Sequence, residues 1–321
     1  MTRRAVVALL AALALLLVGG GVVALAGWGR GDSAEPTGSR STQSARTPAP
    51  TSTRTTSTAS ASPDTAGSAS PAPGDAGSGY YLALGDSLAA GFQLGVDHRT
   101  KGYAGPVRAS VQKRNGATAL VNLGCSGETT SSMLDGGTCS YAEGSQLKQA
   151  EQFLREHADD THLVTLDIGG NDVARCGFEG LKAECTKPSL ATLSTNLPKI
   201  TRRLRAAAPD AQIVLLNYYD PFLVLDLVGS SGLGQKSVAE LAKLNAAIDR
   251  SAKASGATVA DVAAAFQTAV MTPVAVKDVG IVPTNLARIL QWTWMAAPRF
   301  DFHANDAGYA VMAKAVEKQL R

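Results

Sequence analysis

The chain has 321 residues, 45% of them hydrophobic, and a formal net charge of +3 at pH 7. Once the six Arg and four acidic residues of the first 78 positions are set aside, 24 Lys and Arg stand against 23 Asp and Glu. This near balance argues against a polyanionic partner such as a nucleic acid. The cluster of Arg202, Arg203 and Arg205 falls on a predicted helix, whose solvent-facing side ordinarily carries such residues.

The N-terminal segment 1–27 has the features of an export signal. Arg3 and Arg4 precede an uncharged apolar run over 5–26, which ends in the small-x-small triplet Ala24-Leu25-Ala26. At 22 residues the run is also long enough to cross a bilayer as an uncleaved anchor. The glycines at 19–21 weaken the anchor, so we favour cleavage. In either case the rest of the chain is expected outside the cytoplasm.

Residues 28–78 differ in composition from residues 79–321. They consist mainly of Ser, Thr, Pro, Ala and Gly, with almost no large apolar side chain. Such a segment cannot bury enough surface to offset the entropy of ordering, so it is predicted to be a disordered linker. The remaining 243 residues, 79–321, are enough for one domain with a sizeable core.

Within 79–321, short apolar runs alternate with longer amphipathic stretches. Strands are expected at 80–84, 118–123, 162–168, 212–217 and 257–260, and helices near 103–114, 145–157, 189–207, 236–254 and 306–320. Strands rich in Val, Ile and Leu that are separated by helices indicate a parallel sheet covered on both faces. The sequence therefore predicts an α/β domain whose five-stranded parallel sheet lies between two helical layers.

Three glycine-containing loops follow the first three predicted strands. They read Gly-Asp-Ser over 85–87, Gly-Cys-Ser-Gly over 124–127 and Gly-Gly-Asn-Asp over 169–172. Ligands of a parallel sheet bind outside the carboxyl ends of its strands. The topology therefore predicts that the polar groups of all three loops meet at one edge of the sheet.

These loops can supply most of a serine nucleophile's site. Ser87 is the candidate nucleophile, and it needs a base to accept its proton. The oxyanion formed on attack needs donors about 3 Å away. Candidates for that oxyanion hole are the backbone N–H groups of Ser87 and Gly127 and the side chain of Asn171, because a glycine loop allows close approach.

Four histidines are available as the base. His157 ends a predicted helix and His162 opens a predicted strand, so both are expected to be structural. His98 lies in a polar loop and could rim a pocket. His303 immediately precedes the last helix, where the chain returns to the sheet, and is the best candidate.

Neighbouring residues of the loops have simpler interpretations. Asp172 is expected to cap a helix, Gly124 to allow a tight turn, and Asp167 to order the glycine loop after it. The segment "QWTWMAAP" over 291–298 contains Trp292, Trp294 and Met295. These three side chains could line an acyl pocket or belong to ordinary core packing, and the sequence does not decide between the two.

The four cysteines all lie in the C-terminal domain. In an exported chain they suggest two disulfides, and the pairings Cys125–Cys139 and Cys176–Cys185 each join neighbours across one short loop. A zinc site is the competing interpretation. It is disfavoured because there is no Cys-x-x-Cys pair and no nearby histidine.

The motifs "LGDSL", "GCSG", "GGND" and "DFHANDAGY", in this order over most of 80–310, resemble the four blocks of the SGNH (GDSL-type) esterase and lipase family. The resemblance implies a flavodoxin-like three-layer sandwich and an enzyme without metal or cofactor. It implies Ser87 as nucleophile, His303 as base, and Gly127 and Asn171 as oxyanion donors. The segment 291–298 and the cysteines are most similar to secreted actinobacterial members. Those commonly have a third disulfide that is absent here, so the loop 292–298 is expected to be held by packing.

One position departs from the family pattern. The family's acid usually stands three residues before the histidine, where this chain has Phe300, and the nearest aspartate is Asp301, two before His303. Asp301 reaches the imidazole only if the loop is irregular, and otherwise a backbone carbonyl such as that of Phe300 accepts the proton. We favour the carbonyl narrowly. On that basis Asp301→Ala is expected to retain appreciable activity.

Together these features predict an exported, monomeric serine esterase or lipase that forms an acyl-enzyme on Ser87. By resemblance, the substrate is a fatty-acyl or other lipid ester, with a sugar O-acetyl ester as the alternative. A membrane tether is expected only if the N-terminal segment is retained. The rival from another class is a non-catalytic surface-binding domain on the same fold, which would be expected to lack at least one of Ser87, Asn171 and His303.

Overall fold

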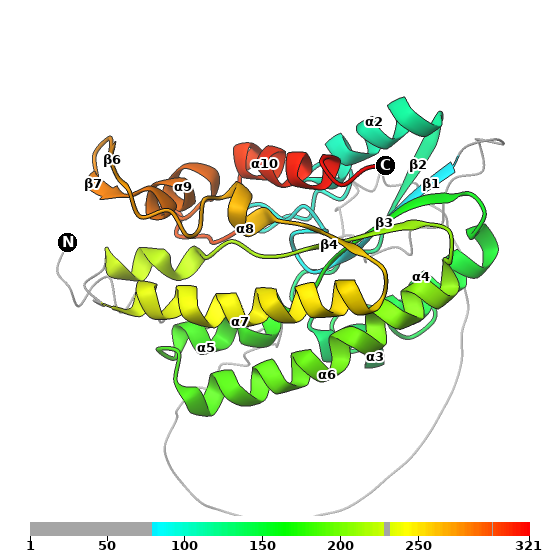
Figure 1. The fold of residues 1–321 in the computed structure, drawn as a ribbon, viewed down its shortest axis with the longest axis horizontal. Coiled ribbons are helices and arrows are strands. Elements are labelled where there is room, and N and C mark those ends of the chain that lie inside the picture. Colours follow the sequence, from blue (N-terminus) through cyan, green and yellow to red (C-terminus); the bar gives the residue numbers. More distant parts are fainter. Residues whose placement is uncertain (1–78, 228–231, 297) are drawn as a thin grey trace, which may run out of the picture. The chain divides into compact units, whose positions relative to one another are not determined.

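The computed structural model describes residues 79–227, 232–296 and 298–321 (Figure 1). The predicted signal or anchor 1–27 and linker 28–78 lie outside the described residues. Within the described ranges, none of the helices combines the length and the apolar character needed to cross a membrane.

Five parallel strands form the central sheet in the order β2-β1-β3-β4-β5. They are β1 (Gly79–Gly85), β2 (Thr118–Asn122), β3 (Thr161–Asp167), β4 (Gln212–Leu216) and β5 (Thr258–Ala260). This is the flavodoxin-like strand order. Each strand lies within one residue of its predicted bounds, because Val, Leu and Ile runs that are buried on both faces give a strong signal.

Helices cover both faces of the sheet, so the predicted three-layer architecture is confirmed. In Figure 1, α2 and α10 lie above the sheet and α4, α6 and α7 lie below it. The helices are α2 (Ala104–Asn115), α3 (Thr130–Asp135), α4 (Gln146–His157), α5 (Gly170–Phe178), α6 (Ala183–Ala207), η1 (Pro221–Asp226, a 3₁₀ helix), α7 (Leu233–Ala254), α8 (Val262–Ala265), α9 (Thr284–Trp292) and α10 (Asp306–Glu317).

Two parts of the fold differ from the sequence prediction. Helix α6 begins at Ala183, six residues before the predicted start, and continues through Pro188 and Pro198. Its first turn contains Cys185, whose disulfide to Cys176 of α5 anchors the helix ahead of Pro188. The antiparallel hairpin of β6 (Pro273–Val276) and β7 (Gly280–Pro283) was not predicted. The hairpin contributes little to the core, and strands are easiest to predict from sequence where their apolar residues are buried in the core.

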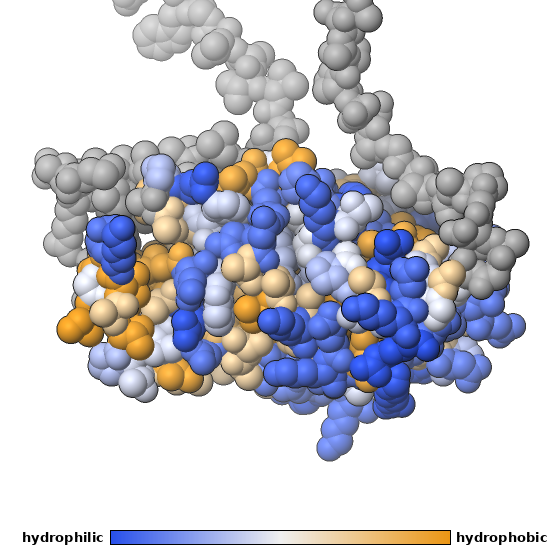
Figure 2. All heavy atoms as spheres, turned by 90° about the horizontal axis from the view of Figure 1, so that it is seen from above, coloured by the Kyte–Doolittle hydropathy of each residue, from blue (hydrophilic) through white to orange (hydrophobic). Residues whose placement is uncertain are grey.

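The hairpin and the residues just before it form an exposed apolar region. Ile281 is 78% exposed, and Val270, Met271 and Val279 are also exposed. In Figure 2, apolar residues gather at the end of the visible face where β6 and β7 lie, and the opposite end is mainly polar. The hairpin is therefore an appendage to the three layers.

Both predicted disulfides are present. Cys125 is bonded to Cys139 and Cys176 to Cys185. All four cysteines are used, so the zinc interpretation is wrong. The first disulfide joins the loop between β2 and α3 to the segment between α3 and α4, and the second joins α5 to α6.

Removal of either disulfide should destabilise the domain. For C125S/C139S and for C176S/C185S we expect a loss of about 2–4 kcal/mol in the free energy of unfolding, because the unfolded chain regains loop entropy. Urea unfolding of the oxidised proteins measures this loss, and each double variant is the control for the other. Mass mapping of the unreduced wild type should recover both pairs. An unchanged unfolding midpoint in either variant would contradict the expectation.

Asp220 joins the segment after β4 to helix α7. Its carboxylate accepts hydrogen bonds from Phe222 N at 3.0 Å and from Ser237 Oγ of α7 at 2.8 Å. The residue is only 1% exposed. Burial raises the pKa of Asp220 from 3.8 to about 6, and the nearby Asp226 adds to this rise. The carboxylate therefore holds η1 against α7 at a cost in desolvation.

This cost predicts a pH-dependent gain in stability for Asp220→Asn. Between pH 3.8 and about 6 the native state binds more protons than the unfolded state, so wild-type stability falls as the pH rises. The asparagine variant does not lose stability in this way. Its free energy of unfolding should therefore equal that of the wild type below about pH 4 and exceed it fully above about pH 6. The difference should be no more than about 3 kcal/mol. Urea unfolding across this pH range measures it. The exposed Asp159→Asn is the control, and an advantage independent of pH would refute the explanation.

Candidate active site

Ser87 lies in the turn that follows β1, next to the imidazole of His303. Ser87 Oγ and His303 Nε2 are 2.9 Å apart, and both residues are almost completely buried. The preceding Gly85 has a φ of +137°, and a Cβ there would lie 2.0 Å from the backbone oxygen of Asp167. Glycine is therefore required where β1 runs closely beside β3 and turns into Ser87.

The other ring nitrogen of His303 contacts Asp301. The distance from Nδ1 to Asp301 Oδ1 is 2.6 Å, and the same oxygen accepts the backbone N–H of His303 at 3.0 Å. An aspartate that accepts the N–H two residues later forms an Asx turn. Phe300, which directly precedes Asp301, has a φ of +51°, so the backbone that leads into this turn is irregular. The favoured arrangement, with a backbone carbonyl on Nδ1, is therefore wrong: the structure has the carboxylate there.

The charge state of Asp301 suits this contact. Burial alone would raise its pKa, but the hydrogen bond and the charge of His303 bring the pKa of Asp301 below its ordinary value. Asp301 is therefore an ionised acceptor at neutral pH. The ring of His303 is flanked by Phe92 and Phe302, with ring centroids 4.4 Å away in each case.

The other three histidines lie elsewhere. The ring of His157 packs at a tilt against Tyr80 and Phe153, and His162 lies at the start of β3, at the end of the sheet opposite Ser87. Their expected structural roles fit this placement. His98 lies in the loop beside Gly91, and its backbone is hydrogen-bonded there. Of the four, only His303 is hydrogen-bonded to Ser87 in the described part of the chain.

The two predicted oxyanion donors beyond Ser87 lie on adjoining loops. Gly127 occupies a turn, with a φ of +86°, that is closed by the bond from Glu128 N to Cys125 O. Asn171 Nδ2 donates to Glu128 O at 2.9 Å and so joins α5 to this turn. The asparagine amide carries a second N–H. Among the described residues, neither Ser87 N nor Gly127 N has a hydrogen-bond acceptor.

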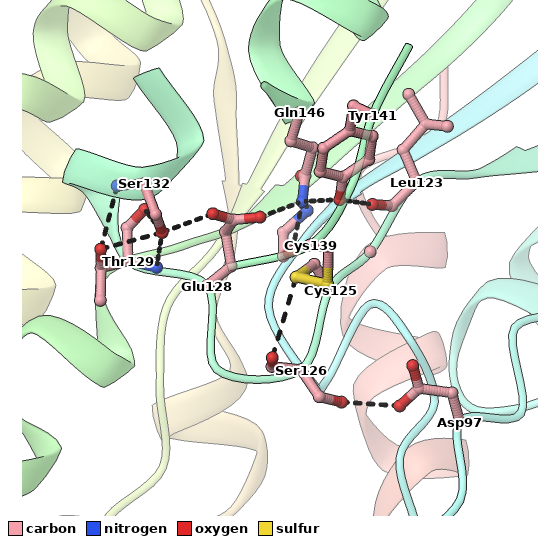
Figure 3. The surroundings of a disulfide bond; sticks show 12 residues. Asp97, Leu123, Cys125, Ser126, Glu128, Thr129, Ser132, Cys139, Tyr141 and Gln146 are labelled. Atoms are coloured by element: carbon pink, nitrogen blue, oxygen red, sulfur yellow. Dashed lines mark hydrogen bonds between the residues drawn. A yellow bond between two sulfur atoms is a disulfide. The ribbon is translucent and has the colours of Figure 1, made fainter. Parts of the chain in front are cut away.

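Sequence reasoning missed a side-chain network that fixes this turn (Figure 3). Gln146, the first residue of α4, exchanges two hydrogen bonds with the backbone of Gly85, at 2.7 and 2.9 Å. Its Nε2 also donates to Glu128 Oε2 at 3.2 Å. Gln146 thus connects the loop of Ser87 to the loop of Gly127. A polar residue at a core-facing position of a predicted helix was the signal that could have revealed it.

Three assignments of neighbouring loop residues need correction. Asp172 accepts from Thr130 N at 2.9 Å, so it caps α3 and not its own helix. Gly124 makes no left-handed turn; a Cβ there would lie 2.5 Å from Ala90 N, so glycine allows close approach of two loops. Asp167 orders the Ser87 loop, because its Oδ1 accepts from the backbone N–H of Asp86 and Ala89.

A cavity that is partly open to solvent reaches Ser87, Asn171 and His303. Gly127 is not among the residues that line it. The walls come from α5, α6, η1 and α7 and are mainly apolar. Their apolar side chains are Leu88, Val173, Ala174, Leu181, Leu190, Pro221, Phe222, Leu241, Leu244 and Phe302. The site can therefore accept an extended apolar group next to the serine hydroxyl.

The tryptophan segment does not line this cavity. Trp292 packs edge-to-face on Phe266, and Trp294 Nε1 donates to Gln93 at 3.1 Å. Met295 is 9% exposed and belongs to the core. Of the two open interpretations, ordinary packing is correct. Backbone hydrogen bonds from Trp294 to the segment of Asp301 and His303 add to it.

Comparison with known proteins agrees with this geometry. The GDSL-like Lipase/Acylhydrolase family matches residues 83–311. No curated protein matches the chain. An extracellular lipase from Streptomyces rimosus has a similar structure, with 21% identity, a TM-score of 0.50 and coverage of 76% of this chain and 100% of the other.

Two further solved structures are similar over most of their length. A phospholipase A1 from Streptomyces albidoflavus is 21% identical, with a TM-score of 0.46 and coverage of 76% of this chain and 100% of the other. A lipase from a goat rumen metagenome is 19% identical, with a TM-score of 0.49 and coverage of 74% and 96%. The family match spans more than two thirds of the sequence and includes Ser87 and His303. The chain therefore belongs to the GDSL-like Lipase/Acylhydrolase family and is a carboxylic ester hydrolase.

Proposed function

We propose that the protein hydrolyses fatty-acyl esters through an acyl-enzyme on Ser87, with His303 as general base and Asp301 as the group that orients it. The observation that carries the proposal is the continuous hydrogen-bonded chain from Ser87 Oγ through both ring nitrogens of His303 to Asp301, with distances of 2.9 and 2.6 Å. A serine hydroxyl becomes an effective nucleophile when a positioned base takes its proton.

The reaction uses each member of this chain in turn. Ser87 Oγ attacks the ester carbonyl carbon while His303 Nε2 takes the hydroxyl proton. Asp301 holds the Nδ1 proton and stabilises the imidazolium. The imidazolium then protonates the leaving alkoxide, and the acyl group stays on Ser87. Water, deprotonated by His303, releases the acid and regenerates the serine.

The oxyanion is proposed to be bound by Ser87 N, Gly127 N and Asn171 Nδ2. The support is that both backbone N–H groups lack other acceptors among the described residues, and that Asn171 lines the same cavity as Ser87. Fixed donors in a site that excludes water stabilise a developing oxyanion strongly. Removal of one such donor typically costs about 10²–10³ in kcat.

The cavity favours a fatty-acyl substrate over a sugar O-acetyl ester. Its apolar walls extend across α5, α6, η1 and α7, and an acetyl group would leave most of these side chains without contact. Burial of an alkyl chain gains about 0.8 kcal/mol for each methylene removed from water. A purely surface-binding domain would have no need for the hydrogen-bonded Ser87, His303 and Asp301.

The domain is proposed to work outside the cytoplasm. Two disulfides support this, because such bonds persist mainly in oxidising compartments. The composition of residues 1–78 supports export through an N-terminal signal and attachment to the domain by a flexible linker. If the signal is retained, the linker would serve as a tether to the membrane.

A panel of p-nitrophenyl esters of graded acyl length tests the substrate proposal, with Ser87→Ala as the blank. We expect kcat/KM to rise from acetate to longer acyl chains. Ala174→Trp should fill part of the cavity and reduce activity on long chains while acetate hydrolysis is retained. Ala310→Trp, at an exposed position of α10, is the matched control. A preference for acetate in the wild type would favour the sugar O-acetyl alternative.

The hydrogen-bonded chain revises the expectation for Asp301. Ser87→Ala and His303→Ala should be near background, and Asp301→Ala should now fall by about 10⁴ in kcat, as in the serine-protease template. Asp301→Asn keeps an acceptor for the backbone N–H of the Asx turn but loses the charge, and it should be similarly impaired. Labelling by a fluorophosphonate and kcat measure these effects. A folded Asp301→Ala that keeps a tenth of wild-type activity would show that the carboxylate is dispensable.

A further inference from the structure

Two buried carboxyl groups lie directly behind the proposed nucleophile, and the proposed reaction uses neither. Asp86 is 2% exposed and Asp167 is 0% exposed. The backbone N–H of Asp86 donates to Asp167 Oδ1 at 3.1 Å, and the two carboxyl groups also interact directly. Asp86 directly precedes Ser87 in the chain, and Asp167 is the last residue of the neighbouring strand β3.

Together the two carboxyls bind the backbone on both sides of Ser87. Asp167 Oδ1 accepts the N–H of Asp86 and that of Ala89, each at 3.1 Å. Asp86 Oδ1 accepts the N–H of Leu88 at 2.9 Å. In the described part of the chain, Ser87 N is left without an acceptor. The pair therefore fixes the turn and leaves free the N–H of Ser87, which is one of the proposed oxyanion donors.

The surroundings of the pair are hydrogen-bonding but contain no compensating cation. Tyr218 hydroxyl donates to Asp86 Oδ2 at 2.7 Å, and Tyr103 hydroxyl donates to Asp167 Oδ2. Among the described residues, no Lys or Arg forms an ion pair with either carboxylate. The other titratable groups that face the pair are Tyr81 of β1, Glu128 after β2, Tyr219 after β4, His303, and Tyr309 of α10.

Two adjacent carboxylates in such a place cannot both be ionised at low cost. Each buried charge loses its hydration, and two like charges at short range repel each other. Burial raises the pKa of Asp86 and of Asp167, and the charge of Asp86 raises that of Asp167 further. Such groups titrate as a pair, so the proton belongs to both.

We propose that Asp86 and Asp167 share one proton at neutral pH and that this acid–carboxylate pair is a positioning element for Ser87. Loss of the shared proton at alkaline pH places two anions side by side under the nucleophile loop. Their repulsion loosens the bonds to the backbone of Asp86, Leu88 and Ala89, and Ser87 loses its alignment. The pair thereby sets an upper pH limit on the reactivity of the serine.

Infrared spectroscopy tests the shared proton directly. At pH 7, the difference spectrum between wild type and Asp167→Asn should contain the C=O stretch of a protonated carboxylic acid. The difference spectrum of Asp86→Asn should contain it as well, because either substitution leaves a single carboxylate that can ionise. Absence of the band from both difference spectra would mean that both groups are ionised, and the proposal would be overturned.

The rate of labelling by a fluorophosphonate across pH tests the positioning role. Asp167→Asn keeps the Oδ1 acceptor, so it should label at close to the wild-type rate at pH 7 and should lose the alkaline decline. Asp167→Ala lacks both acceptors and should label about 10²-fold more slowly, the size of effect expected from a misplacement of about 1 Å. An Asp167→Asn variant that is as slow as Asp167→Ala, or that keeps the alkaline decline, would contradict the proposal.

The pH dependence of the free energy of unfolding is a third test, because the proposal predicts its direction. Since the native pair binds more protons than the unfolded chain above about pH 4, its contribution to stability falls as the pH rises. The stability of Asp167→Asn relative to wild type should therefore increase with pH. The positioning role rests on the proposed function of Ser87, but the infrared test does not. If the fluorophosphonate does not label the wild type but the infrared band of a protonated carboxyl is present, only the proposed role of Ser87 is refuted.

Discussion

The turn that carries Ser87 is fixed by hydrogen bonds from its backbone to side chains of other elements, and the rest of the site depends on this. Asp167 at the end of β3 and Gln146 at the start of α4 supply most of these acceptors and donors. A loop that is held only by its own backbone would move on the scale that disrupts catalysis. Here the three loops at the carboxyl edge of the sheet are connected to one another, because Gln146 and Asn171 both contact Glu128.

The sequence was sufficient for the sheet, the loops at its edge and three of the site residues. Buried parallel strands have an unambiguous apolar signature, and the position of a loop after such a strand determines the edge on which it lies. Ser87 and Asn171 could be placed at that edge on this basis, and His303 by its position just before the last helix. The side chain of Asp301 could not be placed, because its reach depends on an Asx turn and on the positive φ of Phe300. Local backbone geometry of this kind is not encoded in periodicity.

The partners of residues that act through the backbone were also beyond sequence analysis. Gln146 follows the helix cap Ser145 and looks like an ordinary polar residue of an amphipathic helix, yet it is fully buried. Asp172 was identified as a cap, but the helix it caps begins at Thr130, 42 residues earlier in the chain. In each case the partner is distant in the chain, and the pairing is defined only when the layers pack.

The site separates reactivity from substrate selection. The reactive groups come from loops at the end of the sheet, whereas the walls of the cavity come from α5, α6, η1 and α7. The disulfide between Cys176 and Cys185 joins α5 to α6, so it supports the wall and not the nucleophile. Changes in the wall can therefore alter the acyl preference while the serine and its base keep their geometry.

Two carboxylates act on His303 from different sides. Asp301 is hydrogen-bonded to Nδ1, and Asp86 interacts with the ring through space: burial raises the pKa of Asp86, and His303 opposes part of that rise. The imidazolium that the proposed reaction forms on His303 would be stabilised by both, and most strongly where water is excluded. If both Asp86 and Asp167 were ionised, the imidazolium would gain further attraction but the serine loop would lose its fixed shape. A single shared proton keeps one negative charge near the base and preserves the backbone bonds that align the nucleophile.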